Sequence, residues 1–367
     1  MPKVALARCS GYGPDDVRDA VKRSIDLLGG IGKYVRRGMK VLVKPNLLTD
    51  SPPEDAVVTH PEVVRAVGLL AREAGAFVSV GDSPGGYGKN IDRIFDKSGL
   101  RHIAAEEGFE LVKFTTANFV DGIPIAKQAL DADLVISVPK LKTHCVTVMT
   151  GALKNTFGMV PGLYKAECHS RSPKESDLAG ILVKVHSITK PGLTVVDGIV
   201  GMEGDGPSGG RPRPVNVVIA GEDPVAIDSC IAKIIGLKPL DIAVTKEAYA
   251  AGLGEADLSK IEPAGDDIDG FIVKDFKLPK TMPLKMLPKP VLKWALGFVG
   301  FKPHIGRRIC RRCGLCAAAC PVSCITIDAR ECGIDYKKCV RCLCCHEVCP
   351  HKAISIRRNF LTKLVWG

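Results

Sequence analysis

Two runs of cysteine near the C-terminus have a spacing that can bind iron–sulfur clusters. The first run has the pattern C-x2-C-x2-C-x3-C-P from Cys310 to Pro321, and the second repeats it from Cys339 to Pro350. In bacterial two-cluster ferredoxins, three closely spaced cysteines bind one [4Fe–4S] cube and the fourth binds the other cube. The spacing therefore predicts two clusters, one bound by Cys310, Cys313, Cys316 and Cys349 and the other by Cys339, Cys342, Cys345 and Cys320.

The two runs belong to an internal repeat with an offset of 339 − 310 = 29 residues. In that repeat Cys324 occupies the place of Ala353, which favours a small buried side chain over a cluster ligand. Cys332 and Cys344 lack ligand spacing as well. The alternative, a pair of structural zinc sites, would take four cysteines per site without the x3 segment that ends in proline.

The distribution of cysteine also bears on the cellular compartment. The chain has 15 cysteines, and all but four of them lie in the segment 310–349. The N-terminus has no apolar export signal, so this clustering indicates metal binding rather than disulfides and predicts a reducing cytoplasm. The sequence contains no run of about 18 apolar residues, so we expect no membrane-spanning helix.

Residues 1–270 alternate short apolar runs with stretches of helical period. The stretch 15–28 has its apolar residues on one helical face. Thr59 with Glu62 predicts a capping box at the start of a second helix, whose apolar residues follow at helical spacing: Val63, Val64, Val67 and Leu70. This alternation predicts an α/β layered domain with a mainly parallel sheet, followed by a small α+β two-cluster ferredoxin domain. The predicted strands are at residues 40–44, 76–81, 111–114, 134–138, 193–196 and 215–220.

Polar side chains follow several of these strands. Residues 137–162, SVPKLKTHCVTVMTGALKNTFGMVPG, begin as a strand and continue into a segment rich in lysine. Ligands of an open parallel sheet bind beyond the carboxyl ends of its strands. We therefore expect one composite site that faces a bound anion, with the candidate residues Lys44, Asn46, Asp82, Lys140, Lys142, His144, Lys154, Asp197 and Glu203.

The parts of this site have alternative interpretations. The glycine-rich segments can be plain turns, and because neither GxGxxG nor GxxxxGK[ST] is present, no dinucleotide site or P-loop is predicted. The pairs His144-Cys145 and Cys168-His169 could join in a third metal site, although neither has typical ligand spacing. Glu203 and Asp205 could bind Mg²⁺ through their oxygens or belong to an acidic turn.

Charge is concentrated towards the C-terminus. The net charge is +11, and residues 271–367 contribute 19 basic and 5 acidic residues, 19 − 5 = +14. We predict a main domain at 1–275, a basic linker with prolines at 276–305, the ferredoxin domain at 306–358 and a tail at 359–367. The linker could contact a membrane surface or a partner, or pack on the main domain as an apolar connection. Only 5% of residues are aromatic, which argues against nucleic acid as a partner.

The main domain resembles the DUF362 family, which has no well-defined general activity and often carries a C-terminal ferredoxin module. The resemblance implies that the lysine-rich stretch, including Lys140, Lys142, His144 and Lys154, is characteristic of the family. The matching segments are VKPNLL (43–48), THPEVVRAV (59–67), GDSPGG (81–86), VPKLKTH (138–144), TGALKNTFGMVPG (150–162), Lys165 with His169, DGIVGMEGDGP (197–207) and GEDPVAIDS (221–229).

A second, fainter likeness is to nickel-pincer lactate racemases. The order His144, then residues 150–154, then Pro161-Gly162 is similar to their histidine, glycine-lysine and proline-glycine sequence. In those racemases a lysine tethers the cofactor, whereas here Leu153 precedes Lys154 where a glycine is expected. A racemase also needs no net supply of electrons, so the ferredoxin domain would have no role in it.

The main hypothesis is an iron–sulfur redox protein of anaerobic metabolism that passes electrons between its clusters and an anionic substrate or cofactor. Lys44, Lys140, Lys142 and Lys165 would bind carboxylate or phosphate as point charges. His144, His169 or Lys154 would donate the proton that accompanies electron delivery. Asn46, Asp82, Asp197 and Glu203 would position a cation or hydroxyl groups.

Two other hypotheses remain at this stage. In the first, the protein is a non-catalytic electron carrier or adaptor whose basic linker docks a partner enzyme. In the second, it is a racemase-like enzyme that depends on a further metallocofactor. A redox partner protein is expected under the main hypothesis and under the first of these alternatives.

Overall fold

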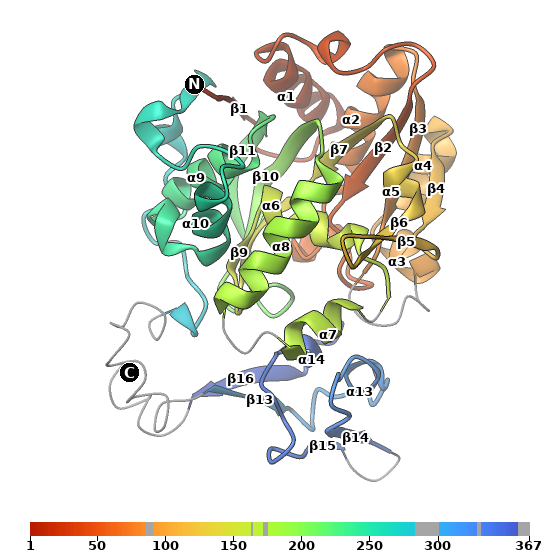
Figure 1. Ribbon diagram of the computed structural model, residues 1–367, viewed down its shortest axis with the longest axis vertical. Coiled ribbons are helices and arrows are strands. Elements are labelled where there is room, and N and C mark those ends of the chain that lie inside the picture. Colours follow the sequence, from red (N-terminus) through yellow and green to blue (C-terminus); the bar gives the residue numbers. More distant parts are fainter. Residues whose placement is uncertain (85–90, 163, 172–174, 283–300, 329–331, 359–367) are drawn as a thin grey trace.

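The computed structural model describes residues 1–84, 91–162, 164–171, 175–282, 301–328 and 332–358 (Figure 1). A large α/β region occupies the first 282 residues, and a small region of short strands and helices lies below it in the view of Figure 1. Most of the predicted linker, including residues 283–300, and the predicted tail at 359–367 fall outside the described residues. The linker's proposed contact with a partner or a membrane surface therefore stays a prediction.

The α/β region is built on one large sheet. Its strand order is β12-β1-β11-β10-β7-β2-β3-β4, with β8 paired to β10 and β9 paired to β8. The run from β10 to β4 is parallel, and β11 is antiparallel to both of its neighbours. The strands are β1 (Lys3–Arg8), β2 (Lys40–Pro45), β3 (Phe77–Asp82), β4 (Glu110–Lys113), β7 (Leu134–Val138), β8 (Lys140–His144), β9 (Val148–Thr150), β10 (Leu193–Glu203), β11 (Arg211–Gly221) and β12 (Glu262–Gly265).

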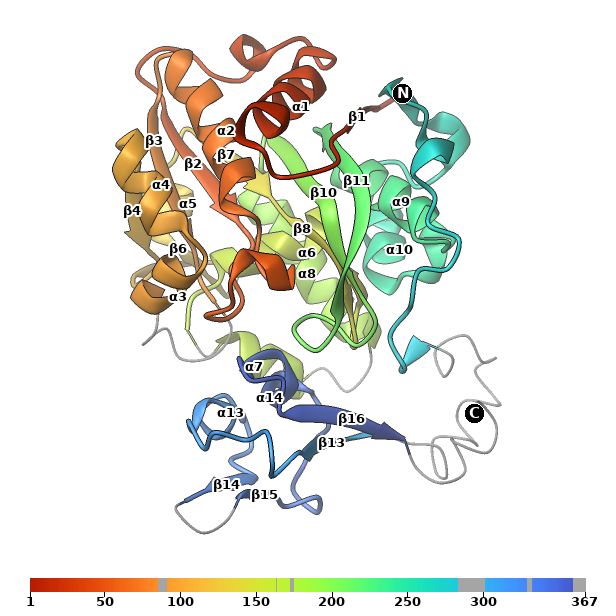
Figure 2. The same ribbon diagram turned by 180° about the vertical axis from the view of Figure 1, so that it is seen from behind.

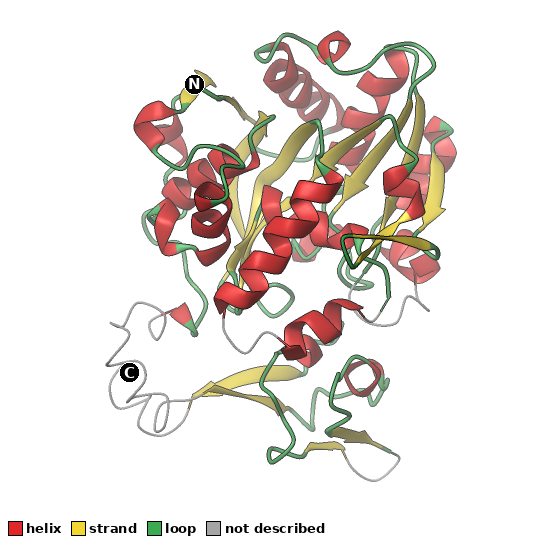
Figure 3. Ribbon diagram, viewed as in Figure 1, coloured by secondary structure: helices red, strands yellow, loops and turns green. Residues whose placement is uncertain are grey.

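Helices cover both faces of this sheet (Figure 3). On β2, Val41 and Val43 belong to one apolar cluster, and the intervening Leu42 belongs to the cluster on the opposite face, as the two-residue period of a strand requires. The longer helices are α1 (Pro14–Asp26), α2 (Pro61–Glu73), α3 (Ile91–Lys97), α4 (Leu100–Glu107), α7 (Tyr164–Arg171), α8 (Glu175–Thr189), α9 (Pro224–Ile234) and α10 (Ala243–Ala250). Shorter elements are α5 (Lys127–Leu130), α6 (Ala152–Asn155) and the hairpin of β5 (Ala117–Val120) and β6 (Ile123–Ala126).

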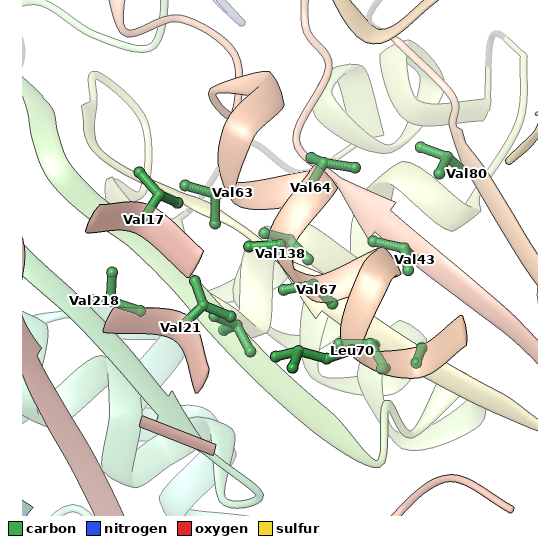
Figure 4. Close-up of a cluster of buried hydrophobic side chains, with 14 of the residues drawn as sticks. Val17, Val21, Val43, Val63, Val64, Val67, Leu70, Val80, Val138 and Val218 are labelled. Carbon is green, nitrogen blue, oxygen red and sulfur yellow. The ribbon is translucent and has the colours of Figure 1, made fainter. Parts of the chain in front are cut away.

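The core beneath α1 and α2 explains why these two helices form. Figure 4 shows Val17 and Val21 of α1 meeting Val63 and Val67 of α2, close to Val43 of the sheet. All five side chains are fully buried. Burying a valine side chain stabilises the fold by about 1.5 kcal/mol or more, so the predicted apolar stripe is the main determinant of both helices.

The start of α2 differs from the capping box predicted from the sequence. The N-cap is His60, whose Nδ1 accepts a hydrogen bond from Glu62 N at 3.3 Å, and Pro61 occupies the first helical position. Thr59 is turned to the sheet instead, where its Oγ1 donates to Val138 O and accepts from Asn46 N. The hydroxyl thus joins two strand ends, a role that the local pattern does not reveal.

Two segments predicted as loops are regular structure. The sequence predicts a strand at 193–196 followed by a polar loop, but β10 continues to Glu203 and pairs with β11 along its length. The lysine-rich stretch after β7 forms the hairpin of β8 and β9, then α6 and the 3₁₀ turn η4 (Thr156–Met159). Asp197 and the lysines of β8 are therefore held by strand pairing rather than by a loop.

The C-terminal region repeats its backbone as well as its cysteines. It contains β13 (Phe301–Ile305) paired with β16 (Ile354–Arg358), β14 (Ile325–Ile327) paired with β15 (Cys332–Ile334), and the helices α13 (Leu315–Ala318) and α14 (Cys344–Glu347). Left-handed φ values recur at three pairs of positions that are 29 residues apart: Arg312 and Arg341, Gly314 and Leu343, Ser323 and Lys352. Figure 2 shows this region beyond one end of the large sheet.

Candidate functional site

A cavity lies between the α/β region and the C-terminal region. Its volume is about 70 Å³, room for about five to seven water-sized positions. The α/β side contributes Asn46, Asp82, Lys154 and Lys165, together with Ser83 and the η4 turn. The opposite wall comes from the cysteine-rich region and consists of Ala319, Cys344, Glu347 and Val348. Of the residues predicted for the site, these four on the α/β side are the ones that the structure brings together at a cavity.

Lys154 is the cation that faces the cavity without a partner of its own. Within the described ranges its Nζ makes no hydrogen bond or ion pair, and the side chain is half-buried on α6. Burial lowers the pKa of Lys154, while the carboxylate of Glu347 across the cavity works in the opposite direction. Asn46 Oδ1, on the same wall, is also buried without a hydrogen-bond partner in the described part of the chain. A polar ligand in the cavity could satisfy both groups.

Lys44 and Asp82 form a buried ion pair in the floor of the cavity. Lys44 Nζ lies 2.8 Å from Asp82 Oδ1 and donates hydrogen bonds to Pro45 O and Asn155 Oδ1. Asp82 accepts from Leu47 N and Ser83 N. Burial lowers the pKa of Lys44 more than the nearby carboxylate raises it. Because every polar atom of the pair has a partner, its role is to shape the floor and fix the strand ends of β2 and β3.

Lys165, on α7, contributes to the cavity through its charge. Its Nζ donates to Ser83 O, Ser83 Oγ and Pro84 O. Burial lowers the pKa of Lys165 to about 7, so the side chain changes charge near neutral pH. His169 lies on the same helix, but its side chain is outside the described residues, and its predicted role stays a prediction.

Lys140 and Asp197 are held in a separate buried network. Lys140 Nζ lies 2.8 Å from Asp197 Oδ2 and 2.7 Å from the hydroxyl of Tyr12. The Tyr12 hydroxyl also donates to Asp197 Oδ1, and the Tyr12 ring stacks on His60 at 3.6 Å. Burial lowers the pKa of His60 to about 4, which keeps it neutral. None of these residues lines the cavity. The structure therefore does not place this predicted pair at the cavity.

Lys142 and Glu203 also have internal partners. Lys142, fully buried on β8, donates to Val57 O at 2.6 Å, and burial holds its pKa well below the ordinary value. Glu203 accepts from Arg211 Nε at 2.7 Å and from Lys277 N at 2.9 Å. Neither side chain lines the cavity. The acidic turn considered for Glu203 is in fact the end of a buried strand that binds a neighbouring arginine.

His144 connects the two regions of the chain. Its Nδ1 accepts from Val146 N and Thr147 N, so the ring proton is on Nε2, which lies 3.0 Å from Glu347 Oε1. His144 is fully buried, and it reaches the cavity only through Glu347, which lines it. Glu347 is not among the residues predicted for the site, because nothing in its position between two cysteines distinguishes it from a solvated carboxylate.

Further contacts fix the cysteine-rich region against the α/β region. His346 Nε2 lies 2.9 Å from Asp205 O, and Ser208 Oγ donates to His346 O at 2.8 Å. Leu343 is fully buried and packs in an apolar cluster with Cys145 and Ile356. Its left-handed backbone occupies the place that a glycine, Gly314, has in the first half of the repeat. A leucine in this costly conformation indicates that the apolar contact outweighs the backbone strain.

The predicted cluster ligands gather into two groups. One cavity is lined by Cys310, Cys313, Cys316 and Cys349, and another by Cys320, Cys339, Cys342 and Cys345. These are the two sets that result when the fourth cysteine of each run crosses to the other group. Cys324 lies beside the second group, with Sγ 3.5 Å from Cys320 Sγ. Thiolates arranged in fours around an apolar cavity are a suitable donor set for an iron–sulfur cube.

The third metal site considered from the sequence includes His169, whose side chain lies outside the described residues, so that site stays a prediction; its other members lie in the ranges that the structure describes. There, no group of three or more histidine, cysteine, aspartate or glutamate side chains could hold a single metal ion. A cube differs from a single ion because each of its cysteines binds a different iron, which keeps the sulfurs apart. Cys145 and Cys168 are each buried in apolar clusters.

The fold and the cysteine groups define an iron–sulfur electron-transfer protein with a large α/β domain. A 4Fe-4S binding domain matches residues 333–355, and the domain of unknown function DUF362 matches residues 41–233. The chain belongs to the DUF362 family. A relative is the thylakoid-associated protein sll1697 of Synechocystis, which is 34% identical over 289 residues, 77% of this chain and 89% of the relative.

Among solved structures, the chain is similar to the lactate racemase apoprotein of Thermoanaerobacterium thermosaccharolyticum. The identity is 14% and the TM-score 0.37, and the match covers 61% of this chain and 55% of that chain. At this TM-score the likeness is too weak to bear on fold or function. In the part of the chain that the structure describes, no helix is both long enough and apolar enough to cross a membrane.

Proposed function

We propose that the protein binds two [4Fe–4S] clusters and passes electrons between them and a small anionic ligand held in the cavity. The observation that supports this most is the composition of the cavity wall. Lys154 and Asn46 approach from the family's α/β domain, and Cys344 and Glu347 approach from the cysteine-rich region. A ligand in this cavity would touch both the lysine-bearing segments and the cluster-binding region.

Under this proposal, the second group of cysteines holds the cluster nearer to the ligand. Two residues of the cavity wall, Ala319 and Cys344, directly adjoin Cys320 and Cys345 of this group in the chain, whereas one, Val348, adjoins Cys349 of the first group. Each bound cluster would supply one electron at a time, so two reduced clusters suffice for a two-electron reduction. Cysteine thiolates must stay reduced to bind iron, and a reducing cytoplasm is the proposed location.

The anion would bind through Lys154. This ammonium group is a point charge with three donors, and none of them has a partner within the described residues. Asn46 Oδ1, which also lines the cavity, would accept a hydrogen bond from a hydroxyl group or a protonated oxygen of the ligand. The Asp82 carboxylate opposes an anion little, because it already pairs with Lys44. A volume of about 70 Å³ fits a small carboxylate or phosphate rather than a nucleotide.

The same residues would supply protons. A two-electron reduction of a carbonyl or alkene group also takes up two protons, and a donor with a pKa near the working pH is the most effective. Lys154, whose pKa is lowered by burial, would donate directly. His144 holds a proton on Nε2 towards Glu347 and would give a second route to the cavity.

Anaerobic titration with small anions tests the proposal. Oxalate, acetate and phosphate would be titrated into the iron-loaded protein and into Lys154→Met, with Lys246→Met on the exposed surface of α10 as the matched control. A charge-assisted hydrogen bond contributes about 1.5–3 kcal/mol. We therefore expect Lys154→Met to weaken binding at least about tenfold, with iron content unchanged.

The control should bind as the unmodified protein does. If none of these anions binds the unmodified protein, or if Lys154→Met binds equally well, the cavity is not an anion site. The non-catalytic electron carrier would then be the better description.

A further inference from the structure

We propose that four exposed arginines beside the first cysteine group form a docking surface for an acidic electron-carrier protein. This arginine face consists of Arg307, Arg308, Arg311 and Arg312. The inference rests on the proposed function only in so far as the cysteines hold clusters. Electrons from outside would enter at the arginine face, delivered by an acidic carrier protein.

The arginine face surrounds the most accessible cysteine of the first group. All four arginines and Cys313 are exposed, whereas Cys316 and Cys349 of the same group are buried. Arg311 and Arg312 line the cavity that these cysteines enclose. Electron transfer between proteins needs a close approach to the redox centre, and Cys313 offers it.

Three of the four charges of the arginine face, those of Arg307, Arg308 and Arg311, are not neutralised within the described chain. Arg307, Arg308 and Arg311 have no carboxylate partner in the ranges that the structure describes. Several exposed arginines of the α/β region do have such partners: Arg18 pairs with Glu73, Arg23 with Asp266 and Arg101 with Asp92. The adjacent Arg36 and Arg37 are exposed without a carboxylate partner in the described ranges, but there only two arginines lie together. Unpaired cations gathered on one surface give a strong positive field, which attracts an oppositely charged partner.

The surroundings strengthen this field. Residues 301–358 contain 12 lysines and arginines against 4 aspartates and glutamates, 12 − 4 = +8. Some of that charge compensates the anionic clusters. Compensation alone does not require exposed arginines around an exposed cysteine, since backbone N–H groups and buried cations serve that purpose as well.

The two cysteine groups then have different neighbours. The first group faces outward beneath the arginine face, and the second adjoins Ala319 and Cys344 in the cavity wall. In each docking event the reduced carrier loses one electron and the oxidised cluster beneath the arginine face gains it. The second cluster would pass that electron on to the cavity.

The experiment measures electron transfer from a carrier of known charge. An acidic plant-type [2Fe–2S] ferredoxin, reduced beforehand, would be mixed rapidly with the iron-loaded protein over a range of salt concentrations. The variant is Arg308→Glu with Arg311→Glu. The matched control is Arg36→Glu with Arg37→Glu, exposed residues just before β2, at the amino end of the parallel strands and away from the cysteines. Dithionite, a small reductant, serves as the second donor.

We expect the ferredoxin reaction of the unmodified protein to slow as salt rises, because screening weakens attraction between charged surfaces. The variant should react at least about tenfold more slowly at low salt and with a flatter salt dependence. The control should react as the unmodified protein does, and the dithionite rate should change less than about twofold in both variants.

Three results would overturn the proposal. The first is a variant that accepts electrons from ferredoxin as fast as the control, and the second is a rate that does not fall with salt. The third is a variant slowed equally with dithionite, which would mean that the arginines tune the cluster itself. If the variant loses iron, the neutral pair Arg308→Gln with Arg311→Gln is used instead. Anion binding at Lys154 is measured separately, by the anion titration. Either proposal can therefore be refuted while the other holds.

Discussion

Replacing Gly158 by alanine should disrupt the floor of the cavity. Gly158 belongs to η4 and lines the cavity beside the buried pair of Lys44 and Asp82. A Cβ at this position would lie 2.0 Å from Asp82 Oδ1 and 2.6 Å from Lys44 Nζ. Its φ lies outside the left-handed region, so the cost comes from these contacts and not from the backbone.

The size of the effect follows from what must move. A methyl group needs more than 3 Å from each atom, so the carboxylate has to shift by over an ångström and leave its 2.8 Å contact with Lys44. Overpacking costs about 1–3 kcal/mol, and breaking a buried ion pair costs about 3–5 kcal/mol. Partial relaxation brings the expected loss of unfolding free energy to about 3 kcal/mol.

Thermal unfolding followed by far-UV circular dichroism under anaerobic conditions measures this loss. For a region of about 280 residues, with an unfolding entropy of about 2.1 cal/mol/K per residue, about 3 kcal/mol lowers Tm by about 5 °C. Gly180→Ala is the matched control, because Gly180 is exposed on α8 and a Cβ there meets nothing within 4 Å. That variant should be as stable as the unmodified protein or up to about 1 kcal/mol more stable. Equal Tm values for the two variants would refute the packing argument.

Two further predictions concern the clusters and the pH dependence. Cys310→Ser should lower the iron content from about eight to about four per chain, whereas Cys344→Ser should leave it unchanged; equal losses would contradict the ligand assignment. Anion affinity should fall as pH rises through about 7, because Lys165 loses its charge there. The pKa of Lys165 is lower in the folded state than in the unfolded state, so the unfolded chain binds more protons between about pH 7 and about pH 10. The contribution of Lys165 to stability should therefore grow as pH rises through this range. Lys165→Gln should flatten both profiles, measured by titration and by unfolding from pH 6 to 9.

The strands and helices show which features of the fold local sequence patterns predict. The strand predicted at 134–138 coincides with β7, and the apolar stripes on α1 and α2 are buried as predicted. These features depend on the period of a strand or a helix, which a few residues suffice to express. The N-cap of α2 was predicted one residue early, because the Thr59 hydroxyl bonds to the end of β7 instead.

The sequence predicts which residues belong to the candidate site better than it predicts how they are arranged. Lys154, Asn46 and Asp82 meet at one cavity, as the strand-end argument suggests, and Lys165, a candidate from the family resemblance, joins them from α7. Lys140 does not join them, although it lies two residues from Lys142 on the same strand. Its partner is Asp197, which lies opposite it in the register of β8 against β10. The register between two strands whose paired residues are 57 positions apart cannot be predicted from either segment alone.

The sequence alone predicts the cluster ligands, because cluster binding depends on spacings of a few residues within each cysteine run. It also determined the parallel α/β architecture through the alternation of apolar runs. The closure of the cavity by the cysteine-rich region is visible only in the folded chain, where Glu347 lies beside His144 and Leu343 packs on Cys145. Those contacts join residues about 200 positions apart, and they form only because both regions are already folded and present complementary surfaces.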